Sequence, residues 1–90
     1  METPKDRLAL IREALTQALH PVTLTVHDES HLHIGHSGAK GGGHFSVEII
    51  CTAFEGKTLV QRHQMIYQAL GALMQTEIHA ISITAKTPHE

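Results

Sequence analysis

The sequence predicts a small α+β domain whose helices and strands follow the order α-β-β-α-β. Two segments carry apolar residues at helical spacing, and three segments alternate apolar with polar residues, as half-buried strands do. Three short strands need a covering layer before one face of their sheet is buried. We therefore expect a two-layer sandwich in which both helices pack on one face of a three-stranded sheet.

The first helix is expected close to the start of the sequence. Thr3 and Pro4 are typical of an N-cap and of the first helical position. The apolar stripe consists of Leu8, Ile11, Leu15 and Leu19. His20 and Pro21 end the helix, because the residue before a proline disfavours helical backbone.

Two strands flank a loop in the next part of the chain. The first strand covers residues 22–27 and turns its valines and its leucine to one side. Residues 28–43 contain five of the seven glycines, so we expect a flexible loop there. The second strand begins at His44 and has an inner face of Phe45, Val47, Ile49 and Cys51.

A second helix and a third strand complete the domain. Thr58 and Gln61 form a capping box that opens a helix from Leu59 to about Gln75. Its expected apolar stripe is Leu59, Ile66, Leu70 and Leu73, widened by Val60, Tyr67 and Met74. The last strand turns Ile81 and Ile83 inward, and residues 86–90 form a polar tail. Residues 1–90 are expected to form one domain.

Composition narrows the function classes. The formal net charge of -2 lacks the basic footprint of a general nucleic-acid binder. Cys51 is the only cysteine, which excludes an internal disulfide and a thiolate zinc site. The start of the chain lacks a signal-peptide core, and no apolar run approaches the roughly 20 residues of a membrane span. We expect a soluble, cytoplasmic protein that does not bind membranes.

Two short motifs are rejected, a GXXG match is kept as a weak nucleic-acid signal, and Cys51 has an ordinary explanation. Residues 56–58 imitate the end of a P-loop, but the glycine that this motif needs five residues earlier is replaced by Cys51. Residues 41–43 offer no helix dipole to an anion. Residues 38–41 match a GXXG loop, which should join two helices rather than two strands. Cys51 closes the apolar face of a strand and is expected to be a small buried residue.

Nine histidines are the strongest chemical signal, because imidazole is the commonest protein ligand for metals. Four lie in or beside the glycine-rich loop: His31, His33, His36 and His44. Solvated loop histidines, or a free-standing divalent-metal site of His31, His33 and His36, are both compatible with this pattern. His63 lies on the second helix, where it either packs against neighbours or serves as a well-oriented ligand.

The ordered motifs of the chain resemble the BolA family. They are Asp28-Glu29-Ser30, His33, His44-Phe45, Phe54-Glu55-Gly56, Arg62-His63, Tyr67 and His79-Ala80. The resemblance covers nearly the whole chain, and its FxGxxxxxRH block is specific. It implies a class II KH-like fold, which agrees with the order of elements expected from the residue pattern.

The resemblance also implies a function without catalysis. BolA proteins pair with monothiol glutaredoxins and share a 2Fe-2S cluster, for which the glutaredoxin supplies a cysteine and a bound glutathione. For this chain the resemblance implies His63 as one cluster ligand and one loop histidine as the other, in the order His33, His36, His44. We expect an iron–sulfur adaptor in cluster sensing or trafficking and in the stress response.

The alternative expectation is a KH-like, DNA-binding regulator of stress and morphology genes. Its nucleic-acid contacts would come from Lys40, Lys57 and Arg62. The free chain is expected to be a monomer or a weak homodimer in either case.

Overall fold

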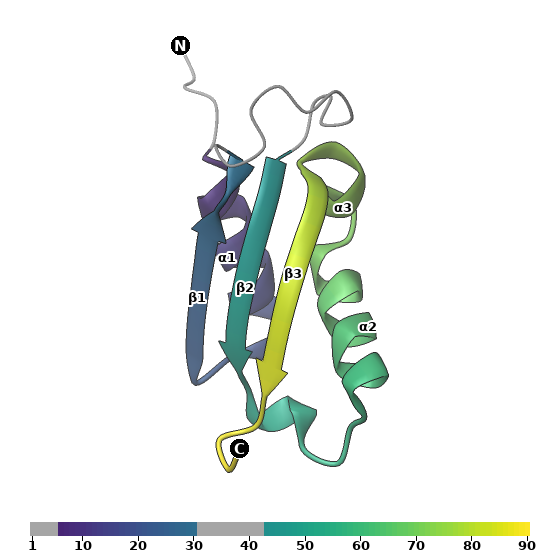
Figure 1. Cartoon of the computed structure of the whole chain (residues 1–90). Helices are drawn as coiled ribbons and strands as arrows, with labels where there is room; N and C mark the ends of the chain where they lie inside the picture. Colours follow the sequence, from purple (N-terminus) through teal and green to yellow (C-terminus); the bar gives the residue numbers. More distant parts are fainter. Residues whose placement is uncertain (1–5, 31–42) are drawn as a thin grey trace.

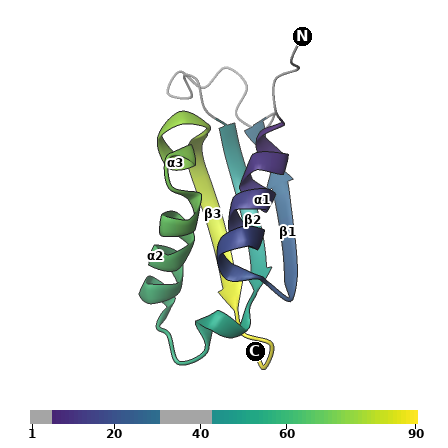
Figure 2. The same cartoon turned by 180° about the vertical axis from the view of Figure 1, so that it is seen from behind.

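The computed structural model describes residues 6–30 and 43–90 as a two-layer α+β domain. The elements are α1 (Arg7–Leu19), β1 (Thr23–Asp28), β2 (Gly43–Ile50), the 3-10 turn η2 (Thr52–Phe54), α2 (Leu59–Leu70), α3 (Leu73–Thr76) and β3 (Ile78–Lys86). Figure 1 shows the open face of the sheet, and Figure 2 shows the opposite face, with α1 lying over it and α2 beside β3. The predicted fold class is confirmed.

The sheet is mixed, with the strand order β1-β2-β3. β1 and β2 are antiparallel, and β2 and β3 are parallel. A parallel pair needs a crossover connection, and α2 provides it. Val26 pairs with Val47, and Val47 pairs with Ile83, so one inward row crosses all three strands. Because a slip of one residue would turn this row to solvent, burial of one face fixes the register.

The core lies between the sheet and the helices. Its buried residues are Ile11, Leu15, Phe45, Val47, Ile49, Cys51, Phe54, Ile66, Leu70, Ile78 and Ala85. The inner face predicted for the second strand is therefore confirmed. The Cys51 thiol is fully buried, and its Sγ lies 3.1 Å from the carbonyl oxygen of Leu19. It packs as a small core residue, as expected.

α1 begins later than the sequence pattern predicted. Asp6 is the N-cap, and its side chain accepts a hydrogen bond of 3.0 Å from the backbone N–H of Leu8. Thr3 and Pro4 lie outside the described residues. The predicted end is confirmed: His20 adopts a left-handed conformation with φ of 49°, and its N–H donates to the Thr16 carbonyl.

α2 begins as predicted but ends early. Thr58 and Gln61 make both hydrogen bonds of the capping box. The expected continuation to Gln75 is wrong, because the chain turns at Gly71 with φ of 54°. This left-handed conformation is costly for residues with a side chain, and glycine adopts it freely. The helix then resumes as the short α3.

The buried face of α2 also differs from the predicted stripe. Leu59 is 64% exposed, Val60 67% and Tyr67 42%. The buried residues are Arg62, Ile66 and Leu70, which follow one another at intervals of four. The helix is therefore rotated so that a buried arginine starts its inner face, and several apolar side chains remain on the surface.

Candidate functional site

Two histidines from different strands lie side by side near the start of β2 and β3. The ring centroids of His44 and His79 are 5.0 Å apart, and the ring planes are inclined by 42°. His79 is exposed, whereas His44 is half-buried and its Nε2 is buried, so the pair is open to solvent on the His79 side. His44 lies only two residues beyond segment 31–42, which carries three further histidines.

An irregularity in the β2–β3 pairing brings these two imidazoles together. Gly43 pairs with Ile78, but His44 pairs with Ala80, so His79 has no residue directly opposite. Two successive residues, His79 and Ala80, are consequently exposed, whereas alternation returns from Ile81 onward. Such a bulge redirects a side chain, and bulges are frequent beside functional sites. Here the bulge places His79 next to His44.

The backbone around His44 is held by several short contacts. The Ser30 hydroxyl accepts a hydrogen bond of 3.0 Å from the His44 N–H, and Asp28 accepts one of 2.9 Å from the Ser30 N–H. The His44 carbonyl accepts from the Glu29 N–H at 2.7 Å. A Cβ on Gly43 would lie 2.7 Å from the Ser30 Oγ, so this close approach requires glycine.

His63 occupies a different part of the molecule. It is half-buried on α2, and its ring centroid lies 6.5 Å from that of Tyr67 in an edge-on arrangement. It lines a groove of about 580 Å³ between α2 and the last residues of β3. On the strand side, the groove lining starts at Ile83. Four residues of strand separate His79 from Ile83, which is about 13 Å. His63 is thus remote from the histidine pair.

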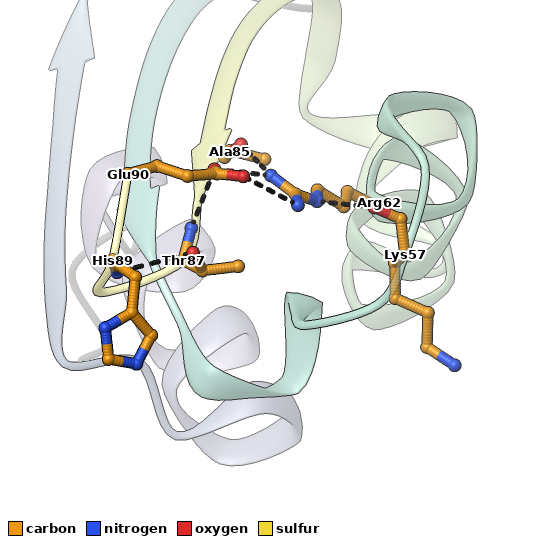
Figure 3. Close-up of polar contacts among 6 residues, drawn as sticks. All are labelled: Lys57, Arg62, Ala85, Thr87, His89 and Glu90. Carbon is orange, nitrogen blue, oxygen red and sulfur yellow. Dashed lines mark hydrogen bonds and ion pairs between the residues drawn. The ribbon is translucent and has the colours of Figure 1, made fainter.

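Arg62 is buried rather than available on the surface. It is 7% exposed, and its guanidinium pairs with the Glu90 carboxylate through bonds of 2.7 and 3.0 Å. It also donates to the carbonyl oxygens of Lys57 and Ala85 at 3.0 and 3.1 Å. Figure 3 shows these contacts joining α2, β3 and the tail. Hydrogen bonding to Arg62 lowers the pKa of Glu90 to about 2.

The structure places the predicted metal ligands and nucleic-acid contacts in different parts of the molecule. His44 lies at the strand ends and His63 in the groove, and His31, His33, His36 and Lys40 lie outside the described residues. Within residues 6–30 and 43–90, no group of three or more potential metal ligands is present. The ligand assignment of His63 stays a prediction. Of the expected nucleic-acid contacts, Lys57 is exposed, whereas the Arg62 guanidinium is already bonded.

His79 was not singled out as a ligand from the sequence. It lies 35 residues from His44, and strand alternation alone would place it on the other face of the sheet from Ala80. The only signal was its presence in the His79-Ala80 motif at the start of a strand. The parallel pairing and the bulge, which no local pattern specifies, are what bring the two imidazoles together.

Comparison with known proteins supports the resemblance seen in the sequence. The family model described as BolA-like protein matches residues 15–90. The chain is 42% identical over 90 residues to BOLA1, chloroplastic, of Arabidopsis thaliana, and covers 56% of that protein. It is 44% identical over 86 residues to SufE-like protein 1, chloroplastic/mitochondrial, of the same plant, and covers 23% of it. The alignments take in 96% and 89% of the chain.

A bacterial relative and a solved structure complete the comparison. The chain is 36% identical over 81 residues to the DNA-binding transcriptional regulator BolA of Haemophilus influenzae, with 90% of the chain and 77% of the relative aligned. The solved structure of BolA1 from Arabidopsis thaliana has a TM-score of 0.82 and 38% identity, covering 97% of this chain and 98% of that one. None of these three relatives carries the name of an enzyme.

The expected cytoplasmic location is corrected by these comparisons. The two plant relatives are named as chloroplastic and as chloroplastic/mitochondrial, and these names point to an organelle. Composition and a single cysteine report on solubility and redox chemistry but do not specify a compartment, which explains the wrong prediction. The chain spans just over half of one plant relative and about a quarter of the other. Among the described helices, none is long and apolar enough to cross a bilayer.

Proposed function

Because the chain belongs to the BolA-like protein family, we propose that it is an iron–sulfur adaptor that binds a monothiol glutaredoxin and shares a 2Fe-2S cluster with it. The observation that carries this proposal is the His44–His79 pair beside the histidine-containing segment 31–42. The similarity to a SufE-like protein is consistent with a role related to iron–sulfur clusters.

The spacing of the pair fits two ligands on one metal ion. Two imidazoles that bind a tetrahedral ion at about 2.1 Å have ring centres about 5 Å apart, and His44 and His79 are separated by 5.0 Å. In Rieske centres two histidines likewise hold one of the two irons. We assign His79 as one ligand. The other is His44 or one of the loop histidines, His33 and His36.

A partner is needed because the described part of the chain offers no accessible thiolate. Cys51, the only cysteine, is fully buried in the core. The second iron would therefore be held by the cysteine of glutaredoxin and by the glutathione bound to it. Histidine ligands raise the reduction potential of such a cluster relative to cysteine ligands. They also protonate near neutral pH, which suits transfer or sensing better than permanent storage.

Reconstitution tests the ligand assignment directly. The chain is mixed with a monothiol glutaredoxin, iron, sulfide and glutathione, and the visible absorption and circular dichroism of the mixture are recorded. We expect a spectrum that differs from that of the glutaredoxin alone, and we expect His79→Ala to abolish the difference. His33→Ala, His36→Ala and His44→Ala identify the second ligand. His89→Ala serves as the control, because His89 is exposed and lies in the tail.

The same series tests the earlier expectation for His63. If His63→Ala removes the mixed spectrum and His79→Ala does not, the helix histidine is the ligand and our assignment is wrong. If the wild-type chain never alters the glutaredoxin spectrum, the shared-cluster function itself is wrong.

A DNA-binding regulator is the second candidate, favoured by the name of the Haemophilus influenzae relative. Against it stand the net charge of -2 and the burial of Arg62. Titration of promoter DNA at about 150 mM salt separates the two functions, since specific sites are usually bound at about 10⁻⁸ M or tighter. Affinity equal to that for random DNA would eliminate this candidate.

A further inference from the structure

We propose that the groove between α2 and the outer edge of β3 binds an extended, acidic segment of a partner protein, which pairs with β3 as a fourth strand. This inference goes beyond the proposed function and uses neither residue of the His44–His79 pair. It depends on the free edge of β3, on the position of α2 and on the charges that line the groove.

β3 presents unpaired backbone groups to the groove. It is an outer strand of the sheet, and among the described residues only β2 pairs with it. The Lys86 carbonyl accepts from the Cys51 N–H on the β2 side, whereas the Ala85 carbonyl accepts from Arg62. Because backbone groups alternate in direction along a strand, the N–H and C=O of Ile83 point to the outer edge, as does the N–H of Ala85. A peptide strand can bond to these groups.

The position of α2 leaves space for a strand in the groove. In both Figure 1 and Figure 2, α2 lies beyond the outer edge of β3 instead of over the middle of the sheet. The groove of about 580 Å³ lies between them, with Leu59 on the helix side and Ile83 on the strand side, and Arg62 closes one part of it by bonding to the Ala85 carbonyl. Leu59 is 64% exposed and would be covered by an added strand. A second copy of this chain fits poorly, because its own α2 would project into the same space.

Charge selects an acidic occupant. Lys57 and Lys86 line the groove together with His63, although the chain as a whole has a net charge of -2. Neither lysine forms an ion pair with a described residue, although the charge of Lys86 acts on Glu90 and contributes to the lowered pKa of that carboxyl. The end of the groove already holds a carboxylate, that of Glu90 on Arg62. Lysines beside a free strand edge would attract acidic side chains and orient the segment that bears them.

A peptide occupant agrees with these features better than nucleic acid does. The groove offers two lysines and a histidine, flanked by the apolar side chains of Leu59 and Ile83. Affinity for nucleic acid grows with the number of phosphates that cations neutralise, so two lysines would give weak binding. The unpaired N–H and C=O groups of a strand form most hydrogen bonds with another backbone. An extended peptide presents its own N–H and C=O groups at the matching spacing.

The experiment uses the full chain without a cluster, so that it is independent of the proposed function. A displayed library of random seven-residue peptides is selected against the wild-type chain, and the best binder is synthesised. We expect selected peptides to be enriched in acidic and β-branched residues. Binding of the synthetic peptide should slow amide hydrogen exchange at Ile83 and Ala85. N-methylation of alternate backbone nitrogens should weaken its affinity at least tenfold.

Two charge variants complete the test. Lys57→Glu and Lys86→Glu should each weaken the peptide at least fivefold, whereas Arg12→Glu, which makes the same charge change beside β1, should not. The proposal would be overturned if no peptide is enriched, or if the bound peptide slows amide exchange at a site other than β3. It would also be overturned if N-methylation leaves the peptide affinity unchanged. Displacement of the peptide by single-stranded DNA at about 150 mM salt with micromolar affinity would assign the groove to nucleic acid instead.

Discussion

At the scale of single residues, Arg62 is the side chain whose role is best defined by its contacts. It is the one charged side chain that is buried among the described residues. Its guanidinium bonds to the Lys57 carbonyl before α2, to the Ala85 carbonyl in β3 and to the carboxylate of Glu90. Buried charges are tolerated when they are paired and fully hydrogen-bonded. Arg62 therefore joins the start of α2 to the end of β3 and the tail that follows it, which lie 23 and 28 residues further along the chain.

The pairing predicts how the tail responds to acid. The Arg62 hydrogen bonds lower the pKa of Glu90 from 4.5 to about 2. A lowered pKa means that the contribution of this pair to stability is fully present above pH 4.5 and is lost as the pH falls through about 2. In the Arg62→Gln variant we expect the Glu90 pKa to rise toward 4.5, as measured by NMR titration of the carboxyl carbon.

Arg12→Gln is the matched control for that titration, because Arg12 is exposed and, among the described residues, its guanidinium donates to the Leu24 carbonyl alone, at 3.3 Å. It should leave the Glu90 titration unchanged. An unchanged Glu90 pKa in Arg62→Gln would show that the carboxylate is not held by the arginine in solution.

A second prediction at this scale concerns Gly43, which precedes His44. A Cβ at this position would lie 2.7 Å from the Ser30 Oγ and 2.9 Å from the Phe45 ring. Overpacking of this kind usually costs about 1–3 kcal/mol. We expect Gly43→Ala to reduce the free energy of unfolding by that amount in urea and to shift the His44 and His79 imidazole resonances.

Ser46→Ala, on the same strand but away from this contact, is the control for Gly43→Ala. It should leave both imidazole resonances in place. A fully stable Gly43→Ala chain with unchanged histidine resonances would mean that Ser30 and Phe45 adjust freely, and that glycine is not required to position the pair.

At the scale of elements, the start of α2 shows how local sequence determines structure. The Thr58 hydroxyl accepts from the Gln61 N–H at 3.1 Å, and the Gln61 side chain accepts from the Thr58 N–H at 2.9 Å. Loss of an N-cap side chain costs about 1 kcal/mol. We expect Thr58→Ala to lower the free energy of unfolding by about that amount. Thr58→Ser should retain most of it, and equal stability of the two variants would contradict the role of the cap.

The same helix shows why its buried face was not predictable from local pattern. The start of α2, the inner row of β2 and the end of α1 follow from caps and periodicity, which are local. The rotation of α2 depends on Arg62, whose carboxylate partner lies 28 residues away. The predicted stripe is correct at Ile66 and Leu70, but it includes the exposed Leu59 where the structure buries Arg62. Apolar periodicity does not predict the burial of a charge that is paired from a distant segment.

The candidate site depends even more on distant pairing. Loop histidines and His63 stand out in the sequence because they are numerous or lie within a specific motif. The His44–His79 pair arises from the parallel pairing of β2 with β3 and from one shift in register. Parallel pairing is itself predictable from the β-α-β order, but the position of a bulge is not. For this reason the sequence pointed to the right region of the chain and missed one member of the pair.

At the scale of the whole molecule, the two proposed surfaces lie at different ends of the sheet. The histidine pair is at the start of β2 and β3, and the groove lies along the last residues of β3. Sites separated by more than about 10 Å without shared partners usually act independently, with coupling below about 0.5 kcal/mol. One protein could then hold a cluster with one partner while the groove binds another segment.

Because the two surfaces are separated, we expect a mutation in one of them to leave the function of the other nearly unchanged. Lys57→Glu should change the lifetime of the reconstituted cluster by less than about twofold, because the charge lies in the groove, remote from His79. His79→Ala should likewise change the affinity of the selected peptide by less than about twofold. Cluster decay is followed by visible absorption, and peptide affinity by calorimetry at the same pH and salt. If the peptide alters cluster decay tenfold in the wild-type chain, the two surfaces are coupled; the short connection through α2 and β3 would then carry the effect, and the groove would act as a regulatory site for the cluster.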